Sequence, residues 1–121
     1  MILETKTEVE VCVLAYEYLG ISNVKLKVPG QTAYPDRLFW IPGGKPLMIE
    51  FKLPGEKPEP KQLHVHKELR ELGYEVQVHD NAADAFEAII NAVAPACISK
   101  ARREVLIRAR RRCAVLRSRT G

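Results

Sequence analysis

The order of periodic segments along the chain predicts an α/β domain built around a small mixed sheet. Apolar residues recur at the spacing of an amphipathic helix over residues 4–19 and 61–72. They alternate with polar residues, as in a half-buried strand, over residues 23–28 and 74–79. The predicted order is a helix, three strands, a helix, a strand and then further helices. A chain of 121 residues accommodates one such domain without disulfide or metal cross-links.

The first predicted helix covers residues 4–19 and ends at Gly20, a suitable C-cap. Glu8 falls within its apolar arc, where a carboxylate is costly unless a partner neutralises it. We therefore expect Glu8 to have a partner or a function. The residues expected on the buried face of this helix are Val9, Cys12, Ala15, Tyr16 and Leu19.

Three strands, a helix and a fourth strand are predicted next. The pair Pro29-Gly30 ends the strand over residues 23–28, and residues 37–41 and 47–53 form a hairpin across the turn Pro42-Gly43-Gly44. A loop over residues 54–60 leads to a helix over residues 61–72, which stops at Gly73. The strand over residues 74–79 completes the sheet.

Two helices are predicted after the last strand. Asn81 can cap the first of them, with Asp84 three residues on in a position like that of a capping box. Pro95 ends this helix, and residues 98–117 form a further amphipathic helix with apolar residues among its arginines.

The composition indicates a folded protein without a membrane span. The chain is 46% hydrophobic and 28% charged, which is too apolar for a disordered chain. No apolar run approaches the roughly 18–20 residues that a membrane span needs. Residues 1–10 hold three acids and one lysine, unlike a secretory signal. These features predict a cytoplasmic protein that does not enter the membrane.

The three cysteines, Cys12, Cys97 and Cys113, are odd in number and widely spaced. This pattern favours neither a disulfide framework nor a Cys-x-x-Cys zinc site. Cys12 and Cys97 are interpreted as small core residues in a reducing compartment.

The net charge of +4 is distributed unevenly along the chain. Residues 99–121 hold nine lysines or arginines against one acid, Glu104, so the rest of the chain is net acidic. A basic tail on an acidic body favours a polyanionic partner, most often nucleic acid. The alternative is a solvated arginine-rich helix face. We therefore divide the chain into a domain over residues 1–95 and a basic helical tail over residues 96–121.

Three charged residues of the hairpin carry the sharpest functional signal. Glu50 and Lys52 are two residues apart in one strand and project to the same face, and Asp36 can lie beside Glu50 across the ladder. Two carboxylates at close range favour a hard divalent cation such as Mg²⁺ or Mn²⁺. An adjacent lysine can stabilise charge that develops on a phosphate. The set suits metal-assisted hydrolysis of a phosphodiester.

The same residues also fit a solvated strand face with a cross-strand ion pair, which is the commoner arrangement. Three features favour a catalytic role for these residues over a solvated strand face. The strand that carries Glu50 is otherwise apolar, a proline-fixed turn precedes Asp36, and Glu8 offers a third carboxylate.

The motifs around these residues, in their order along the chain, resemble the virus-type replication-repair nuclease (VRR-NUC) domain of the PD-(D/E)XK nuclease superfamily. The resemblance spans residues 4–93. The matching motifs are Tyr34-Pro35-Asp36-Arg37-Leu38, the Gly43-Gly44 turn, Met48-Ile49-Glu50-Phe51-Lys52, Pro60-Lys61-Gln62 and Gly73-Tyr74-Glu75-Val76. The resemblance implies a restriction-endonuclease-like core of a helix, a three-stranded meander, a helix and a strand, here with extra C-terminal helices. Tyr34 stands where the family commonly has glycine, which can alter the loop before Asp36.

The resemblance further implies a Mg²⁺- or Mn²⁺-dependent DNA endonuclease. Asp36 and Glu50 would be metal ligands, Lys52 the catalytic lysine, and Gln62 a residue near the substrate or the metal-bound water. The helix-borne acidic ligand would be Glu8, with Glu4 and Glu10 as alternatives. Small stand-alone members of the family occur in phages, often as homodimers, and some favour branched DNA. A phage-encoded homodimer that acts on DNA in the host cytoplasm is therefore implied.

Basic residues outside the motif are candidates for contact with DNA phosphates. Arg37 lies beside the acidic cluster, and Lys57 and Lys61 flank the start of the second helix. The tail adds Arg102, Arg103, Arg108, Arg110, Arg111 and Arg112.

Other residues give weaker signals. His64 and His66 fall about 200° apart on a helix and do not form a good pair of metal ligands. His79 is interpreted as a surface or capping residue. Phe39 and Trp40 alternate across a strand, which favours core packing or a dimer face over base stacking.

Two alternatives to a nuclease remain open on the sequence. One is a catalytically silent DNA- or junction-binding module of the same fold, which metal-dependent turnover would distinguish. The other is an interaction protein whose C-terminal helix mediates assembly, which deletion of residues 99–121 would reveal.

Overall fold

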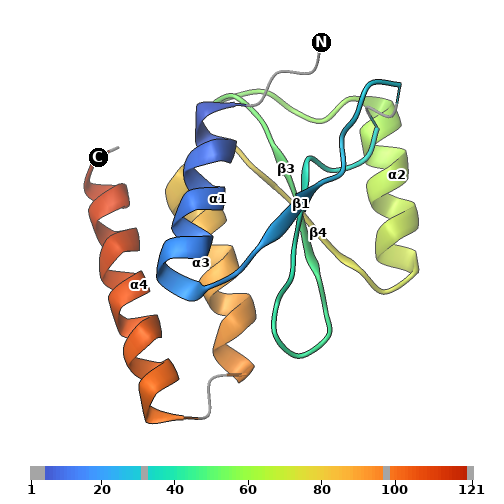
Figure 1. Ribbon diagram of the computed structural model, residues 1–121. Coiled ribbons are helices and arrows are strands. Elements are labelled where there is room, and N and C mark those ends of the chain that lie inside the picture. Colours follow the sequence, from blue (N-terminus) through green and yellow to red (C-terminus); the bar gives the residue numbers. More distant parts are fainter. Residues whose placement is uncertain (1–4, 31–32, 97–98, 120–121) are drawn as a thin grey trace.

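The computed structural model describes residues 5–30, 33–96 and 99–119. Its elements follow the predicted order from α1 to α4 (Figure 1). Their bounds are α1 Lys6–Leu19, β1 Asn23–Lys25, β2 Arg37–Phe39, β3 Leu47–Phe51, α2 Pro60–Glu71, β4 Glu75–His79, α3 Ala82–Val93, η1 Ala94–Ala96 and α4 Lys100–Ser118.

The four strands form one sheet in the order β1-β2-β3-β4. The first three strands are antiparallel neighbours, and β3 and β4 are parallel, which confirms the predicted meander and mixed sheet. The first three strands end two or three residues earlier than predicted. Each runs toward a proline, which cannot donate to the ladder. Gly43 and Gly44 have φ of +102° and +88°, so glycine suits this hairpin turn.

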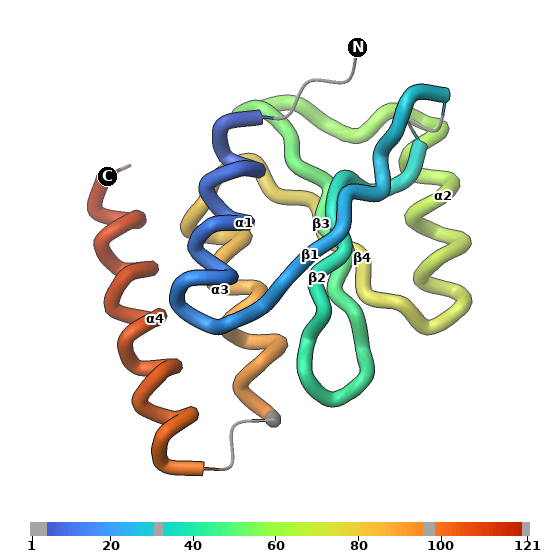
Figure 2. The backbone as a smooth tube through the Cα atoms, viewed as in Figure 1, coloured from blue at the N-terminus to red at the C-terminus, as the bar shows by residue number. Residues whose placement is uncertain are grey.

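Helices cover both sides of the sheet. In Figures 1 and 2, α1 and α3 lie on one side, α2 lies on the other, and α4 lies outside α1 and α3. The buried cluster between the sheet and α1 and α3 includes Val11, Phe39, Ile49, Phe51 and Ile89. A second buried cluster joins α1, α3 and α4 and includes Leu14, Phe86, Ile90, Ala109 and Leu116.

The predicted buried face of α1 was partly wrong. Val9 and Tyr16 are 45% and 66% exposed, whereas Val11, Leu14 and Ala15 are buried. Apolar residues lie on nearly every side of α1, so their spacing does not define a single buried face. The helix packs against both α3 and α4. Glu8 is buried, as the sequence predicts.

Side-chain caps fix where the helices begin. Asn81 Oδ1 accepts from the Asp84 backbone N–H at 2.9 Å, which confirms the predicted cap of α3. The hydrogen bond from Asn81, then that from Arg117, lowers the pKa of the Asp84 carboxyl. Helix α2 begins at Pro60, with Glu59 and Gln62 forming a capping box that sequence reasoning missed.

The basic helix α4 packs on its own chain. Ala109, Cys113 and Leu116 are buried against α1 and α3. At its C-terminal end, Arg117 pairs with Asp84 at 2.8 Å and also with Glu87. The tail that the sequence predicts is therefore an added helical layer over α1 and α3.

The described cysteines lie at apolar positions. Cys12 packs against the first cluster, and Cys113 is buried with its Sγ 3.3 Å from the Ala83 carbonyl oxygen. Burial raises the pKa of the Cys113 thiol. The sequence predicts Cys97 as a core residue and Ile98 as the start of the tail helix. Both residues lie outside the described residues.

Among the helices within residues 5–30, 33–96 and 99–119, none combines the length and the apolar content needed to cross a membrane. The longest of them, α4 at 19 residues, carries arginines throughout.

Candidate active site

The structure brings the two predicted hairpin carboxylates together. The ladder pairs Arg37 with Ile49, so Asp36 and Glu50 are the next facing positions and share the face that α2 covers. Asp36 is 8% exposed and Glu50 is fully buried. Asp36 Oδ2 accepts from the Phe51 backbone N–H at 2.7 Å, which extends the ladder with a side chain and fixes the carboxylate. This agrees with the predicted placement of Asp36 beside Glu50.

A lysine that sequence reasoning missed lies between these carboxylates. Lys27 Nζ is 3.1 Å from Asp36 Oδ1 and 2.8 Å from Glu50 Oε2. Lys27 follows β1, and the Leu26 backbone N–H donates to the Asp36 carbonyl, so the chain carries Lys27 alongside Asp36. Burial acts to lower the pKa of Lys27, but its hydrogen bonds and ion pairs with Glu50 and Asp36 outweigh this, and the pKa is raised.

Lys52 and Gln62 complete the polar cluster. Gln62 Oε1 accepts from Lys52 Nζ and from the Glu59 backbone N–H, both at 2.9 Å. Gln62 Nε2 lies 3.3 Å from Glu50 Oε2, and Lys52 Nζ lies 3.7 Å from the same oxygen. The glutamine thus ties the start of α2 to both Lys52 and Glu50. Asp36, Glu50, Lys52 and Gln62 form one connected cluster.

His66 is a second site residue whose position the sequence did not reveal. It is fully buried, with Nε2 3.8 Å from Glu50 Oε1. Among the described residues, neither ring nitrogen nor Glu50 Oε1 has a hydrogen-bond partner. Burial, then the charge of Arg70, lowers the pKa of His66. His64 is exposed and pairs with Glu68 at 2.9 Å, so the two histidines have different surroundings.

Burial raises the pKa of Glu50 to about 7. The Lys27 and Lys52 ammonium groups act in the opposite direction, whereas the charge of Asp36 adds to the rise. A buried carboxylate is stable in its charged form only with cationic partners. The site is therefore built to keep a cation beside Glu50.

Glu8 is not brought into this cluster. Its Oε2 accepts from Arg37 Nε at 2.7 Å, and Arg37 Nη1 donates to Asn23 Oδ1 at 3.1 Å. Arg37 shares the sheet face of its partner Ile49, which packs in the core under α1. The two faces of the sheet therefore separate Glu8 from Glu50. Of the alternatives to Glu8, Glu10 pairs with Arg119 at 3.3 Å, and Glu4 lies outside the described residues.

Two of the three predicted metal ligands fit a divalent cation. Asp36 Oδ1 and Glu50 Oε2 converge on one ammonium group, and both are hard oxygen donors. Glu50 Oε1 adds a buried oxygen that has no hydrogen-bond partner in the part of the chain that the structure describes. In that same part, no three histidine, cysteine or acidic side chains group as a metal site. The described residues thus offer a divalent cation one carboxylate pair.

The predicted DNA-binding residues fall into two groups. Lys57, Lys61, Arg102, Arg103 and Arg111 are exposed. Arg108 and Arg110 are also exposed, but they have contacts within the protein, as do the half-buried Arg37 and Arg112. Arg37 pairs with Glu8, Arg108 lies 4.8 Å over the Tyr18 ring, Arg110 donates to Asn91 at 3.2 Å, and Arg112 is half-buried beside α1.

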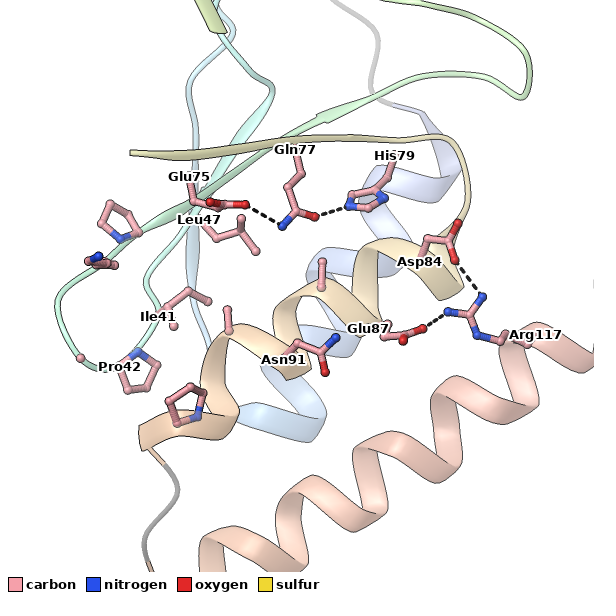
Figure 3. A pocket seen from close by; sticks show the side chains of 16 residues that line it. Ile41, Pro42, Leu47, Glu75, Gln77, His79, Asp84, Glu87, Asn91 and Arg117 are labelled. Carbon is pink, nitrogen blue, oxygen red and sulfur yellow. Dashed lines mark hydrogen bonds and ion pairs between the residues drawn. The ribbon is translucent and has the colours of Figure 1, made fainter. Parts of the chain in front are cut away.

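A pocket among the described residues lies away from this cluster. It has a volume of about 870 Å³ and lies between β4, α3 and the β2–β3 hairpin (Figure 3). Along β4, Gln77 hydrogen-bonds to Glu75 at 3.1 Å and to His79 at 2.7 Å. Asp36, Glu50 and Lys52 do not line it. His79 thus lies in the pocket wall, half-buried.

Comparison with known proteins identifies the family of the chain. No family model matches the chain. "Putative nuclease p44" of Acyrthosiphon pisum secondary endosymbiont phage 1 is 47% identical over 63 residues, which are 52% of this chain and 68% of that protein. A solved structure described as "VRR_NUC domain" is 30% identical with a TM-score of 0.58, over 70% of this chain and 96% of that chain. The chain therefore belongs to the VRR-NUC nuclease family, as its motifs and their order predict.

Proposed function

We propose that the chain is a Mg²⁺- or Mn²⁺-dependent DNA endonuclease that hydrolyses phosphodiester bonds. The observation that carries this proposal is the convergence of Asp36 Oδ1 and Glu50 Oε2 on one cationic group, at 3.1 and 2.8 Å. Family membership supports the reaction class, and the hard oxygen donors support the choice of metal.

A bound Mg²⁺ or Mn²⁺ supplies Lewis-acid polarisation of the phosphate and lowers the pKa of a coordinated water. Asp36 and Glu50 would hold the ion. Lys52 presents its ammonium beside Glu50, where it stabilises the negative charge that builds on the phosphate as water adds and the P–O bond breaks. Gln62 keeps the Lys52 ammonium in place by accepting its hydrogen bond. Glu8, which the sequence predicts as a third ligand, would act by holding Arg37.

Charge and family membership favour DNA as the substrate, including branched or junction DNA. Lys57 and Lys61 are exposed on the loop and helix start that carry Gln62, so they are suited to contact phosphates near the cluster. Lys61 directly precedes Gln62 in α2. The DNA backbone would thus approach from the α2 side of the sheet.

We also propose a homodimer, encoded by a phage and active in the host cytoplasm. Helix α1 exposes Val9, Val13 and Tyr16, which recur at helical spacing and form an apolar stripe suited to a second copy. The phage origin of the nuclease relative supports the proposal that a phage encodes this chain.

Cleavage of a labelled DNA panel tests the proposed function. The panel contains linear duplex, flap, four-way junction and single-stranded DNA at fixed salt, with Mg²⁺, Mn²⁺ or EDTA. We expect wild-type protein to cleave at least one substrate with either metal and none in EDTA, and Lys52→Ala to lose at least about a hundredfold in rate. Lys67→Ala, an exposed lysine on α2, is the matched control. Binding of DNA without cleavage under every metal would instead favour the silent DNA-binding module.

The basic helix α4 gives a separate prediction about affinity. We expect the triple variant Arg102→Gln, Arg103→Gln and Arg111→Gln to bind DNA more weakly. The slope of log K against log salt should become shallower by about 0.9 for each phosphate that the helix no longer neutralises. Cleavage at saturating DNA should not change. Arg117→Gln is the control, because Arg117 is paired with Asp84 and Glu87. Equal affinity and salt slope in the wild type and the triple variant would mean that these arginines only solubilise the helix.

A further inference from the structure

Lys27 is the most completely enclosed cationic group of the candidate active site. Its side chain is 12% exposed, against 14% for Lys52, and its Nζ contacts both carboxylates of the pair. Of the two carboxylates, Lys52 Nζ lies near Glu50 alone, at 3.7 Å. It donates its hydrogen bond to Gln62, at 2.9 Å. The two lysines therefore have different roles, and Lys27 alone bridges Asp36 and Glu50 among the described residues.

The position of the Lys27 ammonium is the position that a bridging cation requires. Two buried carboxylates side by side repel each other unless positive charge lies between them. An ion held by Asp36 Oδ1 and Glu50 Oε2 would need the same two oxygen atoms that Lys27 Nζ now contacts. The ammonium and such an ion cannot occupy this position together, both because of their volume and because like charges repel.

We propose that Lys27 is the built-in counter-ion of the Asp36–Glu50 pair and competes with the divalent metal for it. This inference rests on the proposed metal dependence. Without metal, the Lys27 ammonium offsets the mutual repulsion of the two carboxylates and holds them in register. Metal binding displaces the ammonium, so Lys27 lowers the affinity of the site for the metal. It also disfavours monovalent ions, because they bring no more charge than the ammonium that they would replace.

The flexible side chain of Lys27 suits this exchange. Lys27 lies two residues after the end of β1 and two residues before Pro29. Its ammonium ends a four-carbon stem with several rotatable bonds. The main chain is held beside Asp36 by the hydrogen bond from Leu26 N–H. The side chain can therefore leave the carboxylates while the strand stays in place.

Direct measurement of Mn²⁺ binding tests the proposal without an activity assay. Isothermal titration calorimetry and Mn²⁺-induced thermal shifts are recorded for wild-type protein, Lys27→Met, and Lys45→Met as an exposed-lysine control. We expect Lys27→Met to bind Mn²⁺ at least about tenfold more tightly than wild type. The melting temperature of Lys27→Met without metal should be lower than that of wild type. Mn²⁺ should raise the melting temperature of the variant by more than it raises that of wild type. Lys45→Met should match wild type. Equal or weaker Mn²⁺ binding by Lys27→Met would overturn the competition.

A second measurement uses the wild-type chain and does not depend on whether Lys27→Met folds. The ammonium signal of Lys27 in ¹⁵N NMR, assigned by its absence from Lys27→Arg, is followed during titration with Mg²⁺. We expect it to shift or broaden as the ammonium leaves the carboxylates, while the other lysines away from the site stay unchanged. An unchanged Lys27 signal at saturating Mg²⁺ would overturn the proposal. If wild type and Lys27→Met both fail to bind metal, the proposed function fails as well. If wild-type protein binds the metal and Lys27→Met does not bind it more tightly, the proposed role of Lys27 alone fails.

Discussion

Replacing Asp36 with Asn is expected to reduce DNA cleavage at least about a hundredfold while the protein remains folded. The substitution removes one negative charge from the carboxylate pair, which would hold the metal. It keeps the shape of the side chain, and its amide oxygen can still accept from the Phe51 backbone N–H that Asp36 Oδ2 binds at 2.7 Å. The initial rate in saturating Mg²⁺, on the best substrate of the panel, measures the loss.

The control for this variant is Glu71→Gln, which removes a carboxylate charge from an exposed position at the end of α2. It should cleave like wild type. Circular dichroism and melting temperature establish that Asp36→Asn is folded. Near wild-type cleavage by a rigorously purified Asp36→Asn protein would exclude Asp36 as a metal ligand in the reaction.

The core of the site could be predicted because its signals are local. Glu50 and Lys52 share a face by strand parity, and the Gly43-Gly44 turn fixes the hairpin that places Asp36 opposite Glu50. The two strands are joined by the seven residues between Phe39 and Leu47, so neighbouring segments of the chain set the register of this pair. Asp36 and Glu50 therefore lie together as the sequence predicts.

Lys27 and His66 could not be predicted in the same way. Lys27 reaches the carboxylates only because β1 pairs with β2, and a three-residue strand of alternating residues does not specify its partner. His66 is buried against Glu50 because of how α2 lies on the sheet. Both contacts depend on tertiary placement. Pro60 at the first position of α2, directly after the N-cap Glu59, is a usable local signal for the start of this helix, and the predicted start at residue 61 lies one residue later.

Glu8 illustrates the limit of an argument from a helical face. The pattern places this carboxylate on the buried side of α1, which the structure confirms. It does not identify the partner, and Arg37 takes that role at 2.7 Å. Burial of a carboxylate predicts that a cation lies nearby, but both a metal and a guanidinium satisfy that condition.

The burial of α4 against its own chain leads to a large expected effect on stability. Leu116 is 2% exposed and belongs to the cluster with Leu14 and Phe86, whereas its neighbour Val115 is 48% exposed. We expect Leu116→Ala to lower the free energy of unfolding by about 2–5 kcal/mol, because it removes buried methyl groups and leaves a cavity. Val115→Ala, one residue away on the same helix, should change it by no more than about 0.5 kcal/mol. Urea unfolding at fixed protein concentration measures both.

The contrast between these variants also tests which chain α4 packs on. If α4 lies on its own chain, the loss in Leu116→Ala is independent of protein concentration, because no subunit contact is broken. A loss that grows on dilution would instead mean that α4 crosses to a second copy. Equal effects of the two substitutions would contradict the orientation of α4 itself. With the observed packing, the apolar side of α4 stabilises the domain and leaves the exposed Arg102, Arg103 and Arg111 available for phosphates. One helix thereby combines a structural layer with a basic surface.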